Sequence, residues 1–246
     1  MRWLKPVNSW RAFAGEITII VIGVLIALGA QSFMEQWRWR EEVETANAAF
    51  RDEFIAASGV AYERLIIQPC LQGRIRDLSK KLGGDDGLWT ASPMAVINNQ
   101  YSNVMPVAYR APSRLLPTDA WKNTMANGTL HHLSSERVRE MSSLYDQIAK
   151  FDELQGEEAR AAAKLTPLAF DRSLSVASRT ELLGSLAEVD RINALMALMA
   201  GQMIESVRGL RLKYLKSEVE KGRLELVQTQ RAARGACVLN LAFDPG

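Results

Sequence analysis

The chain has 246 residues, of which 48% are hydrophobic and 24% charged, and this ordinary globular composition excludes wholesale disorder. Its formal net charge is +2, and basic residues alternate with acidic ones instead of gathering in one field. We therefore expect no nucleic-acid partner, because such binding needs a patch of lysine and arginine.

The first predicted element is an apolar segment at residues 12–35, within which residues 17–34 carry no formal charge. As a helix, this segment would be about 35 Å long, against a hydrocarbon core of about 30 Å. Four of the six tryptophans flank it, at positions where such rings favour the two headgroup layers: Trp3, Trp10, Trp37 and Trp39. The pattern predicts one transmembrane helix surrounded by membrane lipid.

A cleaved signal peptide is the alternative for this segment. Arg2, Lys5 and Arg11 make a basic start, and residues 27–29 have the small side chains of a cleavage site. However, the apolar run continues without a break to Met34, and the flanking tryptophans would have no role in a discarded leader. These two features favour an uncut anchor.

Basic residues on the two sides of the segment predict its orientation. The short N-terminal side carries Arg2, Lys5 and Arg11, and the side with the basic excess stays in the cytoplasm. We expect a cytoplasmic tail at residues 1–11, the transmembrane helix at 12–35 and an extracytoplasmic domain at 36–246. The bulk of the chain would then be exported.

Helical periodicity continues beyond the membrane. Apolar side chains recur at helical spacings over residues 36–68, so the anchor is expected to continue outward as a stiff rod until Pro69 interrupts it. A short helical face then runs to Gly83. Three later helices are predicted: residues 118–128, residues 134–165, and about forty residues that follow a Ser178–Glu181 capping box and end near Tyr214.

These elements define the expected fold. It is all-α, with one N-terminal transmembrane helix that continues into an antiparallel bundle of about four helices. After Gly222, the apolar run at residues 237–243 either packs on the bundle or forms a strand.

The connection between residues 83 and 117 is predicted to be largely irregular. Asp85 and Asp86 lack the ligand spacing of a calcium loop, and three prolines follow a possible short helix at residues 94–104. Long connections in compact domains are often functional, which makes four residues candidates here: Tyr101, Tyr109, Arg110 and Arg114. The alternative is a loop that covers one end of the bundle.

Cys70 and Cys237 are the two cysteines of the chain. An exported domain permits one disulfide bond between them, which in the chain-entropy model would contribute about 4 to 5 kcal/mol for so long a loop. Two separate buried thiols are the alternative, and neither cysteine has the spacing of a metal or redox motif.

Other residue patterns indicate no chemistry. His131 and His132 are adjacent and would point to different faces of a helix, which does not suit chelation of one ion. Met196, Met199 and Met203 have the spacing of core residues. We find no nucleophile elbow, phosphate-binding loop or HExxH motif, and we expect no catalytic, cofactor-binding or metal site.

Two stretches carry a resemblance to a known group. The anchor EITIIVIGVLIALGAQSFMEQW and the stretch DAWKNTMANGTLHHLSSERVREMSSLYDQI resemble a group of uncharacterised bacterial single-pass membrane proteins, which have a Glu-led N-terminal anchor and a helical extracytoplasmic domain. The matching positions are Glu16, Ala120, Trp121, Gly128 and Tyr145. The resemblance implies a shared architecture, with the anchor in a bacterial inner membrane and the main domain in the periplasm, and no activity.

Small residues on the predicted span suggest a function. Gly23, Ala27 and Ala30 allow close packing of a second transmembrane helix. We therefore expect a non-catalytic accessory or scaffold subunit that associates with a larger membrane complex or with itself. The alternative is a ligand-sensing periplasmic bundle, which would have to signal through a partner because its cytoplasmic tail is so short.

Overall fold

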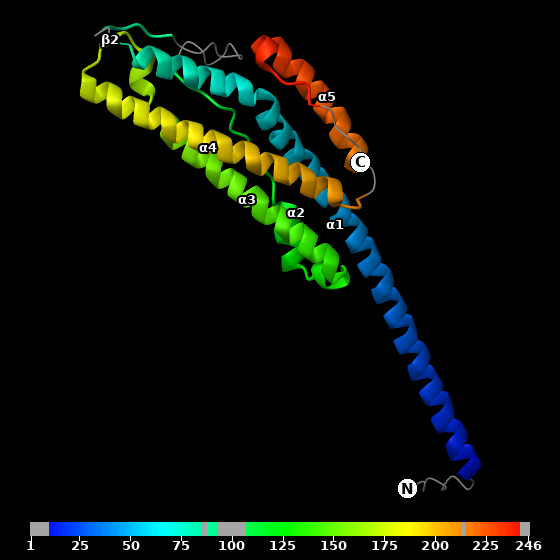
Figure 1. Ribbon diagram of the computed structural model, residues 1–246. Helices are drawn as coiled ribbons and strands as arrows, with labels where there is room; N and C mark the ends of the chain where they lie inside the picture. Colours follow the sequence, from blue (N-terminus) through cyan, green and yellow to red (C-terminus); the bar gives the residue numbers. More distant parts are fainter. Residues whose placement is uncertain (1–9, 85–87, 93–106, 213–214, 242–246) are drawn as a thin grey trace.

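The computed structural model describes residues 10–84, 88–92, 107–212 and 215–241, and these residues form an all-α protein (Figure 1). The α-helices are α1 (Trp10–Leu82), α2 (Asp119–Ala126), α3 (Ser135–Ala163), α4 (Val176–Gly209) and α5 (Leu215–Arg234). Three short 3₁₀ helices accompany them: η1 (Thr129–His132), η2 (Thr166–Ala169) and η3 (Gly235–Cys237). Strands β1 (Leu88–Trp89) and β2 (Arg172–Ser173) pair antiparallel in a very small sheet. The predicted all-α fold with a helical bundle is confirmed.

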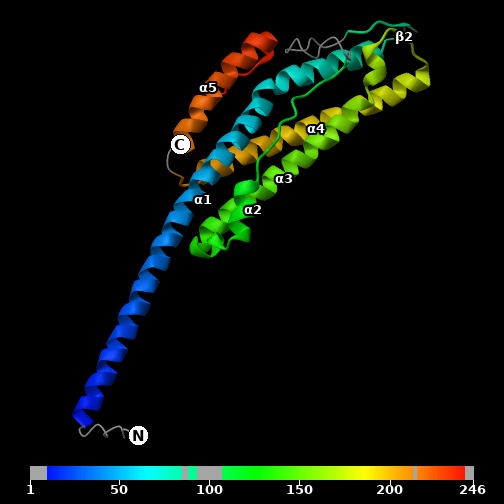
Figure 2. The ribbon, with the colours of Figure 1, turned by 180° about the vertical axis from the view of Figure 1, so that it is seen from behind.

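Helix α1 runs through 73 residues and has two distinct parts. Its N-terminal part projects away from the rest of the molecule (Figures 1 and 2), and residues 13–38 are all exposed. This part is long and apolar enough to cross a membrane, and none of its most apolar stretch is buried within the protein. Its distal part, from Phe50 onward, contributes fully buried side chains to the bundle core.

Our prediction that Pro69 interrupts the helix is wrong, because Pro69 lies inside α1. Proline lacks an N–H donor and displaces the carbonyls of the preceding turn, so it bends a helix that tertiary packing holds together. The helix changes direction in its cyan part (Figures 1 and 2). The carbonyl of Ile66, in that preceding turn, accepts a hydrogen bond of 2.8 Å from the backbone N–H of Leu239. The C-terminal segment therefore docks where the proline loosens α1.

The bundle forms around the distal part of α1. That part packs against α4 and against α5, and α3 packs against α4. Helices α1, α3 and α5 point away from the N-terminus, whereas α4 runs back toward it (Figures 1 and 2). Residues 107–118 return along the bundle as an extended segment, which lets α3 start at the end nearer the N-terminus. Large side chains that fill the core are Phe50, Phe54, Ile66, Leu144, Phe151, Leu186 and Met196.

Several helix boundaries differ from the predictions. The Ser178–Glu181 capping box is wrong: Ser175 is the N-cap of α4, and its Oγ accepts a hydrogen bond of 3.1 Å from the N–H of Ser178. Helix α4 ends at Gly209, and a separate helix, α5, continues through Gly222. We missed α5 because its buried face includes polar residues, which hide an apolar stripe.

Other boundary predictions are confirmed. Ser134 caps α3, and its hydroxyl accepts from the N–H of Arg137 at 3.3 Å. Gly128 has a φ of 81°, the left-handed conformation that glycine adopts readily just after a helix. The predicted helix at 94–104, together with Asp85, Asp86, Tyr101 and Tyr214, lies outside the described residues.

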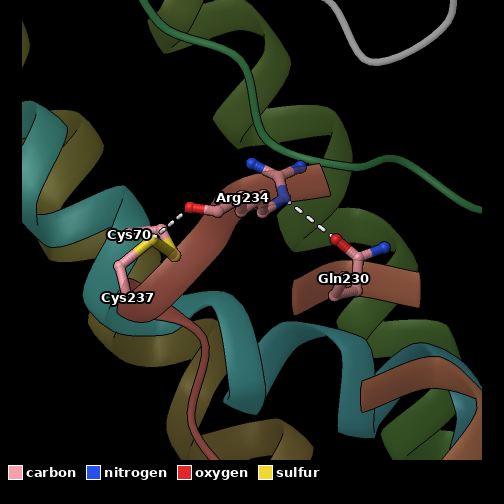
Figure 3. The surroundings of a disulfide bond; sticks show 4 residues. All are labelled: Cys70, Gln230, Arg234 and Cys237. Atoms are coloured by element: carbon pink, nitrogen blue, oxygen red, sulfur yellow. Dashed lines mark hydrogen bonds between the residues drawn. A yellow bond between two sulfur atoms is a disulfide. The ribbon is translucent and has the colours of Figure 1, made fainter. Parts of the chain in front are cut away.

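A disulfide bond joins Cys70 of α1 to Cys237 at the end of η3 (Figure 3). The two Cα atoms lie 5.1 Å apart and are separated by 167 residues in the sequence. One turn before Cys237, the Nε of Arg234 donates a hydrogen bond of 2.9 Å to Oε1 of Gln230. Val238, the next residue after the disulfide, is buried on the bundle. The described part of the apolar C-terminal run therefore packs on the bundle and does not form a strand.

The first prediction concerns this covalent link. Replacing both cysteines by serine (C70S/C237S) should lower the free energy of unfolding by about 2 to 5 kcal/mol, because the unfolded chain regains the freedom of a long loop. Urea unfolding of the full chain in mild detergent measures this change. A thiol reductant should lower the midpoint of the wild type and leave that of the double variant unchanged. Equal midpoints for the oxidised and reduced wild type would contradict the prediction.

Candidate membrane interface and buried polar network

The tryptophans predicted at the membrane interface occupy different surroundings. Trp10 and Trp37 are 81% and 58% exposed, so each presents most of its surface away from the protein. Trp39 is half-buried, and its ring stacks on His132 of η1 with the ring centroids 4.0 Å apart. The guanidinium of Arg38 lies 5.3 Å from the centre of the same ring. Trp39 therefore joins the apolar part of α1 to the bundle, while Trp3 lies outside the described residues.

The small residues of the apolar segment are all exposed. Apart from its chain neighbours and the adjacent backbone of its own helix, a Cβ atom added at Gly23 would meet no atom of the described chain within 4 Å. With 3.6 residues per turn, Gly23, Ala27 and Ala30 lie on one side of α1. That side is exposed along its whole length.

A buried polar network crosses the bundle, and Arg64 of α1 is part of it. Its Nη1 and Nη2 atoms donate hydrogen bonds of 2.8 and 2.7 Å to the carboxylate of Glu158 on α3. Nη2 also donates to Oδ1 of Asn193 on α4, at 2.7 Å. The hydroxyl of Tyr109 donates to Oε1 of Glu158, at 2.8 Å. This cluster fixes α1, α3, α4 and the extended segment to one another.

The neighbouring residue, Glu63, forms a second cluster on another side of α1. Its carboxylate accepts hydrogen bonds of 2.9 and 2.8 Å from the guanidinium of Arg114 and one of 2.9 Å from Nε2 of Gln230 on α5. The side chain of Gln155 exchanges two hydrogen bonds with the backbone of Arg114, at 2.8 and 3.0 Å. Hydrogen bonding to Glu63 raises the pKa of Arg114. The second cluster attaches α5 and the extended segment to α1.

Glu53 forms a third cluster nearer the apolar segment. It accepts a hydrogen bond of 2.8 Å from the backbone N–H of Ala120 and one of 2.5 Å from the hydroxyl of Tyr145. Thr118 makes no side-chain capping bond, and the carboxylate of Glu53 instead pairs with one of the free N–H groups at the N-terminus of α2. The ring of Tyr145 stacks on Trp121, 5.0 Å away. Three of the five matching positions of the resemblance, Ala120, Trp121 and Tyr145, thus lie together near Glu53.

This arrangement supports packing more directly than catalysis. Each of the three buried glutamates accepts hydrogen bonds from at least two groups, which leaves it little capacity to bind or deprotonate a substrate. Among the described residues, no group of three or more histidine, cysteine, aspartate or glutamate side chains is placed to hold a metal ion. Met196 and Met203 are buried in the core and Met199 packs against it, as their spacing predicted.

Sequence reasoning found part of this network. The long connection was singled out for Tyr109, Arg110 and Arg114, and two of these contact buried glutamates. We missed Glu63, Arg64, Glu158 and Asn193. The sequence feature that could have identified them is the presence of charged residues on helix faces that also carry apolar stripes.

Comparison with known families, characterised proteins and solved structures finds no match.

The second prediction tests the central ion pair. Glu158→Gln should destabilise the fold by about 3 kcal/mol or more, because it leaves the buried charge of Arg64 without its counterion. Glu188→Gln is a matched control, since its partner Lys164 is 55% exposed, and it should cost less than about 1 kcal/mol. Urea unfolding measures both changes. Similar losses of unfolding free energy in the two variants would contradict the prediction that the buried pair stabilises the fold more than the exposed pair.

The third prediction concerns alkaline pH. Burial raises the pKa of the Tyr109 phenol, and the nearby carboxylate of Glu158 raises it further. Burial and the hydrogen bond to Glu53 likewise raise the pKa of Tyr145. The unfolded chain then ionises these phenols first, near their ordinary pKa of about 10, so their contribution to stability is complete below that pH and is lost as the pH rises above it.

Urea midpoints measured below and above pH 10 test this dependence. The wild-type midpoint should fall on the alkaline side, and the fall should be smaller in Tyr109→Phe/Tyr145→Phe, which has no phenol to ionise at either position. Equal falls of the urea midpoint in the wild type and the double variant would show that Tyr109 and Tyr145 do not cause the loss of stability at alkaline pH.

Proposed function

We propose that this chain is a non-catalytic, membrane-anchored accessory or scaffold subunit of a bacterial inner membrane, with its bundle on the periplasmic side. The continuity of α1 carries the proposal. One uninterrupted helix contains both an exposed apolar segment and the central helix of the bundle. Such a helix fixes the position and orientation of the bundle relative to the membrane, as a positioning subunit requires.

Two observations support the periplasmic side. Disulfide bonds persist in oxidising compartments such as the periplasm, and the bundle contains the Cys70–Cys237 bond. The basic residues before the span favour a cytoplasmic N-terminus. The disulfide and the charge pattern are independent, and both favour the same orientation.

The expected partners are membrane lipid and either another membrane protein or a second copy of this chain. The exposed side with Gly23, Ala27 and Ala30 supports helix association, because small residues let two backbones approach closely. The engagement of the buried carboxylates in packing supports a role without catalysis.

A ligand-sensing bundle is the second candidate. Glu63 and Arg64 lie on the same helix as the apolar segment, so a ligand that shifted α1 within the bundle would also move the span. Signalling would then require a partner that detects this movement.

The fourth prediction tests the scaffold proposal. The full chain, expressed in bacteria and extracted in mild detergent, should co-purify with a stoichiometric membrane partner or as a defined oligomer. Gly23→Leu/Ala27→Leu should weaken this association because the added side chains separate the two backbones. Val21→Leu, on a different side of the span, is the control and should leave the association intact.

Three outcomes would count against the proposal. Recovery of the intact chain in a salt-washed aqueous fraction would show that the chain is not anchored in the membrane. A mature chain that starts near Gln31 would show that the apolar segment is a cleaved signal peptide. A lone chain whose melting temperature rises with a small molecule would favour the sensor.

A further inference from the structure

A groove of about 560 Å³ lies against α1 directly beyond the apolar segment. Its lining includes Ser32, Glu35, Trp39, Arg40 and Glu44 of α1, together with His132 of η1. The volume lies within the range of about 300 to 1,000 Å³ in which small ligands or headgroups are bound. The stacked rings of Trp39 and His132 bring α1 and η1 together at this groove.

The position of the groove follows from the spacing of charges along α1, if the chain is anchored as proposed above. Residues 17–34 are uncharged, and Glu16 and Glu35 bracket a helical length of about 28 Å, which matches the hydrocarbon core. The next turns, from Glu35 to Arg40, rise about 8 Å, which is about the thickness of one headgroup layer. The groove therefore lies at the level of the phospholipid headgroups.

The charges of the groove suit a headgroup of mixed charge. Within the described chain, Glu35, Arg40 and Glu44 are not part of any ion pair. The guanidinium of Arg40 matches the geometry of phosphate oxygens, and the carboxylates accept hydrogen bonds from an ammonium group. Two carboxylates against one guanidinium disfavour a headgroup with net negative charge.

The surface next to the groove suits acyl chains. Leu25 and Leu28, which are 62% and 57% exposed, lie on the same side of α1 as Ser32. Gly23, Ala27 and Ala30 lie roughly on the opposite side, at 100° per residue. A lipid in the groove and a second helix on the small-residue side therefore do not compete for the same surface.

We propose that this groove binds the headgroup of one phospholipid with a primary ammonium group, phosphatidylethanolamine. Arg40 holds the phosphate, Glu44, one turn further from the hydrocarbon core on the same face of α1, accepts hydrogen bonds from the ammonium, and the acyl chains follow Leu28 and Leu25 into the bilayer. A choline headgroup cannot donate the ammonium hydrogen bonds, and a glycerol headgroup lacks the positive charge. The inference rests on the membrane anchoring proposed above.

The fifth prediction tests this binding. The full chain is reconstituted in vesicles of equal parts phosphatidylethanolamine, phosphatidylcholine and phosphatidylglycerol, extracted in mild detergent, and analysed by native mass spectrometry. We expect one retained phosphatidylethanolamine per chain, enriched about tenfold over the other two lipids. A tenfold enrichment corresponds to the free energy of about one charge-assisted hydrogen bond. Arg40→Gln and Glu44→Gln should each lower the enrichment several-fold. Arg76→Gln, an exposed arginine on α1 far from the groove, should leave it unchanged.

Flotation of the same vesicles separates failure of the anchor from failure of the groove. A chain that does not float with the vesicles would overturn the anchoring itself. A chain that floats but retains the three lipids equally, prefers phosphatidylglycerol or keeps its preference in Arg40→Gln would overturn the groove proposal and leave the anchoring intact. Cross-linking of Gln36→Cys to a second copy would identify the groove as a protein interface and would also overturn lipid binding.

Discussion

Two adjacent charged residues of α1 organise the bundle. Arg64 reaches Glu158 and Asn193 on α3 and α4, whereas Glu63 reaches Arg114 and, on α5, Gln230. Removing charges from water is unfavourable, and here bidentate hydrogen bonds compensate for the loss of hydration. Such bonds tolerate little displacement, so the two clusters favour one register of each neighbouring helix along α1. Apolar packing alone would leave that register less sharply defined.

The attachment of α5 combines weak apolar packing with a covalent link. Its buried residues include Arg223 and Gln230, so α5 buries less apolar surface than a helix with a fully hydrophobic face. The Cys70–Cys237 bond and the hydrogen bond from Leu239 to Ile66 hold the segment after α5 on the same turns of α1. These are the turns next to Pro69, which has no N–H to donate to the preceding turn of α1. The C-terminal segment thus stabilises both α5 and the bend.

The sequence predicted those elements whose buried faces are apolar. The periodicity of α3 and α4 revealed both helices, and the uncharged run of α1 revealed the apolar segment. Periodicity failed for α5, because Arg223 and Gln230 occupy its buried face, and at Pro69, because tertiary packing maintained a helix that local preferences would end. The buried polar network was found in part at Tyr109 and Arg114, whose positions in a long connection drew attention to them. Glu63 and Arg64 were missed because pairing partners far away in sequence are invisible to local patterns.

The rigidity of α1 also has a mechanical consequence. Between Glu35 and the bend at Pro69, α1 extends over 34 residues, which corresponds to about 50 Å of helix. If the span leaned by an additional 10° in the bilayer, the bundle at the level of Pro69 would swing sideways by about 9 Å. Changes in membrane thickness, which alter the lean of a span only slightly, would therefore be amplified in the bundle.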